Sequence, residues 1–178
     1  MRYATRHAPL VLLRMIPLLL GCGCVAPTVK AESDLGAETY IDHHGGTLAP
    51  AGTLEIDGRR ISCGQYPTVL DPDLHDFAAA PRSFLILNPD RFAGLATPVK
   101  LWIFAHECAH QTAGADEVRA DCAAVQRGRR ERWLNADGLA QVCEFMRPAR
   151  ADRTHFSGEQ RCAEMQQCFR NDSKPSRR

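Results

Sequence analysis

The sequence predicts an α+β fold in which a small β-sheet and hairpin precede a mainly helical part. Residues 53–56 and 59–63 flank Asp57-Gly58 with alternating apolar and polar side chains, and this dipeptide is typical of two-residue hairpin turns. The short apolar run 83–88 is closed by Asn-Pro, as expected of a buried strand. Helix-start signals and longer apolar segments dominate the second half of the chain.

Composition sets limits on the class of protein. The chain has 178 residues, a formal net charge of +1 and eight cysteines. This size predicts one compact domain, over residues 51–170, with a hydrophobic core. We expect a flexible arm at residues 32–50 and a disordered polar tail at residues 171–178. The balanced charge gives no indication of a nucleic-acid partner, and the cysteine count indicates metal binding or an oxidising compartment.

The N-terminal segment has the character of an export signal. Three arginines precede an apolar run at residues 15–20, which is too short to span a bilayer. Two cleavage outcomes remain open: lipidation of Cys22 in a lipobox-like context, or cleavage after Ala31 at a small-x-small site. We therefore expect residues 1–31 to be a signal peptide and the protein to be periplasmic or secreted, in contact with a membrane only through a lipid on Cys22.

Six cysteines remain after such cleavage, an even number that predicts up to three disulfides in an exported chain. Six cysteines allow 15 pairings, and the sequence does not choose among them. The candidates are Cys63, Cys108, Cys122, Cys143, Cys162 and Cys168.

A buried helix is predicted from Thr97, a good cap followed by proline, to about residue 111. It is apolar nearly all round and should be central. It carries His106, Glu107 and His110 in a His-Glu-x-x-His pattern. Histidines four residues apart lie on one helix face and can share one metal ion, with the glutamate beside it. Such groups are costly in a buried helix unless they bind something, so we predict one Zn²⁺ ion.

A second helix is predicted over residues 117–129, with Asp116 as its cap. Glu117 and Asp121 are spaced i, i+4 and share one face of this helix. We expect Glu117 to reach the metal and Asp121 to hold the far nitrogen of a ligating histidine, which fixes the orientation of the ring.

The remaining segments complete the predicted order of elements. Residues 66–81, rich in Pro and Asp, are expected to form a loop. A third helix is predicted over residues 137–146, and Ser157 begins a capping box for a last helix. Cys108 points away from the histidine face, so we expect it to form a disulfide or to pack, and not to bind zinc.

Together these motifs resemble the gluzincin metallopeptidases that include the CAAX prenyl protease, the HtpX-like peptidases and their soluble periplasmic relatives. The resemblance covers roughly residues 83–165: Leu-Asn-Pro at 87–89, the His-Glu-x-x-His motif, Glu-x-x-Ala-Asp at 117–121, and His155 with Arg161 six residues later. It implies a zincin-like fold with the active-site helix at its centre, and hydrolysis of a peptide or protein substrate.

Three departures from the family pattern stand out. Phe156 replaces the proline after His155, and the family's membrane-spanning segments are absent. Only six residues separate His110 from Glu117, fewer than in the family. This short link makes Asp116 an alternative third ligand, although its predicted capping role favours Glu117.

The function predicted is that of a zinc-dependent peptidase of the cell envelope. Zinc held by His106, His110 and Glu117 would activate a water molecule, and Glu107 would take its proton. By resemblance, His155 with Arg161 would stabilise the developing oxyanion; the alternative for His155 is a surface or capping role. The alternative function is a catalytically inactive, disulfide-stabilised envelope protein or lipoprotein that uses the same fold as a binding or assembly module. The intact Glu107 disfavours this alternative.

Overall fold

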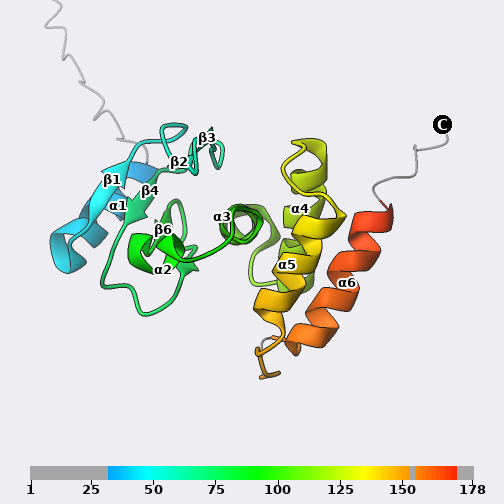
Figure 1. The fold of residues 1–178 in the computed structure, drawn as a ribbon. Helices are drawn as coiled ribbons and strands as arrows, with labels where there is room; N and C mark the ends of the chain where they lie inside the picture. Colours follow the sequence, from blue (N-terminus) through cyan, green and yellow to red (C-terminus); the bar gives the residue numbers. More distant parts are fainter. Residues whose placement is uncertain (1–31, 153–154, 172–178) are drawn as a thin grey trace, which may run out of the picture.

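The computed structural model describes residues 32–152 and 155–171, which form an α+β fold with six helices and two small sheets (Figure 1). In chain order the elements are α1 Glu32–His44, β1 Thr47–Ala49, β2 Glu55–Ile56, β3 Arg59–Arg60, β4 Thr68–Leu70, β5 Ala78–Ala79, β6 Leu85–Leu87, α2 Pro89–Ala93, α3 Thr97–Ala113, α4 Glu117–Arg130, α5 Ala136–Met146 and α6 Gly158–Asn171. No helix in these described ranges is long and apolar enough to cross a membrane.

The main sheet has four strands in the order β1-β4-β6-β5. Strand β6 is buried along its whole length, which confirms the strand predicted from the apolar run 83–88. It pairs in parallel with β4 and antiparallel with β5. Both partners lie in the segment 66–81, so the prediction of a loop there was wrong for residues 68–70 and 78–79. Strands of two or three residues between prolines and aspartates are too short to produce a recognisable alternation.

The segment 32–50 is not a loose arm, because it forms α1 and the edge strand β1. Ala37 of α1 packs with Val69, Phe84 and Ile86 in a small core on one face of the sheet. Tyr40 Oη also donates a hydrogen bond of 2.5 Å to Asp71 Oδ2. Burial, together with this hydrogen bond, raises the pKa of Tyr40 to about 12. The few apolar residues of α1 gave no helical pattern, and only contact with the sheet orders the segment.

The predicted hairpin is confirmed by the pairing of β2 with β3 around Asp57 and Gly58. Both turn residues have positive φ, 48° and 77°, as a type I′ turn requires. The Asp57 carboxylate accepts hydrogen bonds from Thr97 Oγ1 at 2.7 Å and from Lys100 Nζ at 2.8 Å. The hydrogen bond from Lys100 holds the pKa of Asp57 below its usual range. Thr97 is therefore not the helix cap that was predicted: Ala96 occupies that position, and Thr97 ties the hairpin to α3.

Helix α3 is central and buried, as predicted. In Figure 1 it is seen end-on between the sheet and the helices α4, α5 and α6. Its residues 101–106 are all buried, and it packs against β2, β5 and β6 on one side and against α4 and α5 on the other. Any side chain projecting from α3 toward α5 or α4 is consequently held on a rigid support.

Two predicted helix caps are confirmed. Asp116 Oδ1 accepts a hydrogen bond of 3.0 Å from the Arg119 backbone N–H at the start of α4. Ser157 and Gln160 form the reciprocal pair of a capping box at the start of α6. Both signals depend on residues three apart in the sequence, which is why they could be recognised without knowledge of the fold.

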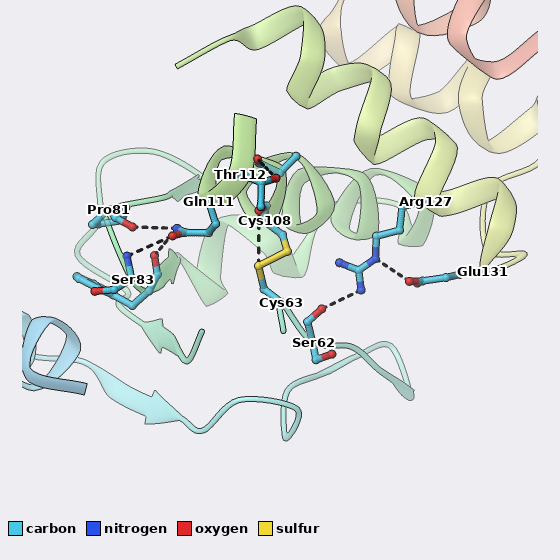
Figure 2. Close-up of a disulfide and its surroundings, with 11 residues drawn as sticks. Ser62, Cys63, Pro81, Ser83, Cys108, Gln111, Thr112, Arg127 and Glu131 are labelled. Atoms are coloured by element: carbon cyan, nitrogen blue, oxygen red, sulfur yellow. Dashed lines mark hydrogen bonds and ion pairs between the residues drawn. A yellow bond between two sulfur atoms is a disulfide. The ribbon is translucent and has the colours of Figure 1, made fainter. Parts of the chain in front are cut away.

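All six candidate cysteines pair, in three disulfides. Cys63–Cys108 joins the segment after the hairpin to α3 (Figure 2). Cys122–Cys168 joins α4 to α6, and Cys143–Cys162 joins α5 to α6. Three disulfides agree with an oxidising, exported environment. The predicted signal peptide with Cys22 and the C-terminal tail beyond residue 171 lie outside the described residues.

Near Cys108, the end of α3 is also fixed to the chain that enters β6. Figure 2 shows Gln111 bridging to this segment: its amide nitrogen donates to Pro81 O at 2.9 Å, and its amide oxygen accepts from the Ser83 backbone N–H at 3.2 Å. The C-terminal end of the predicted metal-binding helix is thus anchored by one disulfide and one side-chain bridge.

Replacing Gly158 by alanine is expected to destabilise the fold. A Cβ atom at Gly158 would lie 1.8 Å from the Met146 carbonyl oxygen, so α6 would have to move away from α5. We expect a loss of about 3 kcal/mol in the free energy of unfolding, measured by urea denaturation with the disulfides intact. Gly94→Ala is the matched control, because nothing lies within 4 Å of its Cβ position. Equal stabilities for the two variants would show that the α5–α6 contact is looser than described.

Candidate metal centre

His106, His110 and Glu117 converge in the structure as a group that can hold a metal ion. The two histidine Nε2 atoms are 3.0 Å apart. Glu117 Oε2 lies 3.2 Å from His106 Nε2, and Glu117 Oε1 lies 3.5 Å from His110 Nε2. Tetrahedral coordination with bonds of 2.0–2.1 Å separates ligand atoms by roughly 3.3 Å, so the three donors are spaced as one small cation requires.

The short link between the histidines and Glu117 is a tight helix hairpin. Helix α3 ends at Gly114, whose φ of 64° is a left-handed value and whose N–H donates to His110 O at 3.1 Å. Asp116 then caps α4, so its carboxylate is bonded to backbone and not to the histidines. The structure therefore brings Glu117, and not Asp116, to the two histidines.

The far nitrogen of each histidine lies close to an oxygen atom of another residue. His110 Nδ1 lies 2.6 Å from Gly114 O, and a carbonyl oxygen can only accept, so Nδ1 carries the proton. His106 Nδ1 lies 2.9 Å from Asp121 Oδ1, the contact predicted for Asp121. The Nε2 atoms of both rings thus face a common point, as ligation of one ion requires.

Two atoms of the cluster are buried without a well-aligned hydrogen bond within the described residues, Glu117 Oε2 and His106 Nδ1. Each has a close neighbour, but the angle is poor. A buried carboxylate oxygen without a hydrogen bond, such as Glu117 Oε2 beside His106 Nε2, is costly unless a cation satisfies it. The donor set of two imidazoles and one carboxylate suits a first-row divalent metal such as zinc.

The electrostatics of the cluster also favour added positive charge. Burial alone would lower the pKa of His106, yet its interactions with Asp121 and Glu117 outweigh burial and raise the pKa to about 9. Burial opposes ionisation of Glu117 as well, but the neighbouring His106 and His110 hold its pKa below the usual range. A metal ion between the two histidine Nε2 atoms would interact favourably with the same carboxylates, Glu117 and Asp121.

Asp121 and Arg161 form a buried pair behind His106. The Asp121 side chain is 1% exposed and accepts two hydrogen bonds of 2.7 Å, from Arg161 Nε and Nη2. Burial would raise the pKa of Asp121, but the bonds from Arg161 and His106 lower it. Arg161 was expected beside the oxyanion; in the structure its guanidinium is committed to Asp121, and its Nη2 is 3.8 Å from Glu117 Oε2. This geometry indicates that Arg161 positions Asp121 and, through it, His106.

Two disulfides flank this pair along the chain. Cys122 directly follows Asp121, and Cys162 directly follows Arg161. Because both disulfides attach α6, the helix that carries Arg161 is covalently held against α4 and α5. The prediction of up to three disulfides is therefore confirmed, and two of them join α6 to α4 and α5.

His155 lies at the open side of the cluster, with its Nε2 3.4 Å from Glu117 Oε1 and its side chain 41% exposed. The Asp152 carboxylate accepts a hydrogen bond of 2.8 Å from the His155 backbone N–H and lies 3.1 Å from the ring Nδ1. Asp152 was not among the predicted residues. An acidic residue three positions before a histidine in a loop carries too little signal to be recognised from sequence.

A cavity of about 640 Å³ opens at the cluster. Its wall includes His106, Glu107, Glu117, His155 and Arg161. Burial raises the pKa of Glu107, an effect that the neighbouring histidines partly oppose. The residue predicted to act as the base therefore lines the same cavity as two of the three candidate ligands, His106 and Glu117.

Models of known protein families, curated proteins and solved structures were compared with the chain, and none of them matches it. The resemblance to gluzincin peptidases consequently rests on the motif residues of the sequence.

Proposed function

We propose that this chain is a zinc-dependent peptidase with a zincin-like active site. The observation that carries the proposal is the convergence of His106, His110 and Glu117 beside a cavity that His106, Glu117 and Glu107 line. Three protein ligands with an open fourth side are typical of catalytic zinc sites, whereas structural sites are closed by four. A metal at this position faces a cavity large enough for a segment of substrate.

The ligands would be His106, His110 and Glu117, held in place by Gly114 O and by the Asp121–Arg161 pair. A zinc ion bound there would supply a Lewis acid that lowers the pKa of a water molecule and polarises the peptide carbonyl. Glu107 would accept a proton from an attacking water molecule and deliver it to the leaving amine. His155, steadied by Asp152, donates a hydrogen bond to the oxygen that becomes negative in the transition state.

The edge of the sheet supports a peptide as the substrate. Strand β5 is the last strand in the order of the main sheet, and Ala78 of this strand lines the cavity. An extended peptide can add to such an edge through backbone hydrogen bonds. The backbone of a peptide bound in this way would run along the cavity wall that includes His106 and Glu117.

The proposed location is the cell envelope or the exterior. The three disulfides support an oxidising compartment, and the N-terminal segment has the character of a signal peptide. The choice between a soluble protein and one anchored by a lipid on Cys22 depends on where residues 1–31 are cleaved.

The proposal is tested by cleavage of an unfolded protein substrate. The protein is produced in an oxidising compartment. Cleavage is measured with the protein as isolated, then after treatment with a chelator such as 1,10-phenanthroline, and finally after zinc is added back. We expect cleavage that the chelator abolishes and zinc recovers. A chain that binds one zinc per molecule yet cleaves none of the substrates would contradict the peptidase and favour the inactive binding module.

A further inference from the structure

Part of the cavity wall is aromatic. It includes Phe77, which precedes β5, and Phe145 near the end of α5. The two rings meet edge to face with centroids 5.2 Å apart, and the ring of Trp102 lies 6.5 Å from that of Phe145. Because α3, α5 and the strand edge each contribute a ring, this wall is held by the core and not by a single loop.

Phe156 adds a third phenylalanine at the mouth of the same cavity. It is 50% exposed, and among the described residues only Leu48, 39% exposed, is another exposed large hydrophobic side chain. A single exposed apolar residue is ordinary. Phe156 differs from Leu48 because it lines the cavity and directly follows His155. Its position is that of a residue that becomes covered when a ligand binds.

We propose that Phe77, Phe145 and Phe156 form a subsite for one bulky apolar side chain, such as Leu, Met or Phe, of an extended peptide. This inference rests on the proposed peptidase function, whose substrate preference it defines. The side chain would lie beside the scissile bond, because the aromatic wall and the cluster share one cavity. Phe156 determines specificity by covering that side chain from the solvent side.

The charges around the aromatic rings favour a peptide over a long lipid chain as the occupant. Asp76, Arg150 and Asp152 also line the cavity. A hydrocarbon chain would leave these groups facing apolar atoms, which is costly. A peptide places one apolar side chain against the rings and leaves polar backbone groups near the charges, as is usual in ligand sites with few polar anchors.

The test compares peptides that differ at a single position. A mixed library of unstructured decapeptides is incubated with the zinc-loaded protein, and the cleaved bonds are mapped by mass spectrometry. We expect Leu, Met or Phe to be enriched at one fixed position next to the cleaved bond. Phe156→Ala should lower kcat/KM for those peptides roughly tenfold, mainly through KM, and change kcat/KM for peptides with Ala at that position less than about twofold.

Leu48→Ala is the matched control, because it removes the other exposed apolar side chain, on β1, away from the cavity. It should leave kcat/KM unchanged for peptides with a bulky apolar residue and for peptides with Ala at that position. Melting temperatures of the two variants, read by circular dichroism, show whether either change disturbs the fold. Cleavage without preference at any position, or an equal loss for all peptides in Phe156→Ala, would overturn the subsite.

A binding measurement separates this inference from the proposed chemistry. Fluorescence polarisation of a labelled Leu-containing decapeptide is recorded with the zinc-loaded protein carrying Glu107→Gln, with and without Phe156→Ala. Roughly tenfold weaker binding in the double variant supports the subsite, even if the wild type cleaves nothing. Absence of cleavage by the wild type would count against the peptidase function but not against the subsite. Equal binding in both proteins would refute the subsite.

Discussion

Glu107→Gln is expected to leave the metal bound and to abolish peptide cleavage. Glu107 is adjacent to His106 but is not one of the three converging donors, so its replacement leaves the donor set complete. The amide of glutamine cannot accept the proton of an attacking water molecule. Loss of a general base costs about 10²–10⁴-fold in rate, so kcat should fall at least about a hundredfold at one zinc per chain.

Glu131→Gln is a suitable control for this change, because it also neutralises one carboxylate. Glu131 lies just after α4, where it forms an exposed pair with Arg127 (Figure 2). Its replacement should alter neither zinc content nor kcat. Undiminished cleavage by Glu107→Gln would remove Glu107 from the mechanism, and loss of zinc in that variant would show that the glutamate holds the metal.

The elements that could be predicted from sequence depend on short-range signals. The hairpin at Asp57-Gly58 and the caps Asp116 and Ser157 each depend on contacts within about four residues. The buried helix α3 was visible from its unbroken apolar character. Strands β4 and β5, by contrast, are stabilised by pairing with β6, and α1 by packing on the sheet. Nothing local distinguishes such segments from a loop.

The same distinction applies to the candidate metal centre. The helical period alone places His106 and His110 on one face, and the i, i+4 spacing places Asp121 one turn beyond Glu117. The pairing of Arg161 with Asp121 spans 40 residues and depends on how α6 packs against α4. Sequence motifs could thus identify the candidate metal ligands and Asp121. They could not show that the guanidinium of Arg161 holds the Asp121 carboxylate.

The disulfide pairings were beyond prediction for a related reason. Cys63–Cys108 and Cys122–Cys168 close loops with sequence separations of 45 and 46 residues, and each pairing depends on the packing of distant elements. The fold shows where these two disulfides lie relative to the candidate site. Both lie beside functional candidates, since Cys108 follows Glu107 and Cys122 follows Asp121.

Glu117→Ala is expected to remove zinc from the protein, whereas Asp116→Ala should retain it. Glu117 is the proposed third donor, and without it only two imidazoles remain to hold the ion. Changes to residues that merely support a ligand reduce metal affinity about 10–100-fold, so loss of a ligand itself should exceed about a hundredfold. Zinc per chain after dialysis against a weak chelator should fall from about one toward zero.

Asp116→Ala is a demanding control because it changes the adjacent acidic residue, on the same short link. It removes the cap of α4, at a cost of about 1 kcal/mol in the free energy of unfolding, but leaves all three donors in place. The measurement therefore separates loss of a ligand from disturbance of the helix start, provided that circular dichroism shows both variants folded. The reverse result, zinc lost with Asp116 and retained without Glu117, would make Asp116 the third ligand and require the first turn of α4 to rearrange when metal binds.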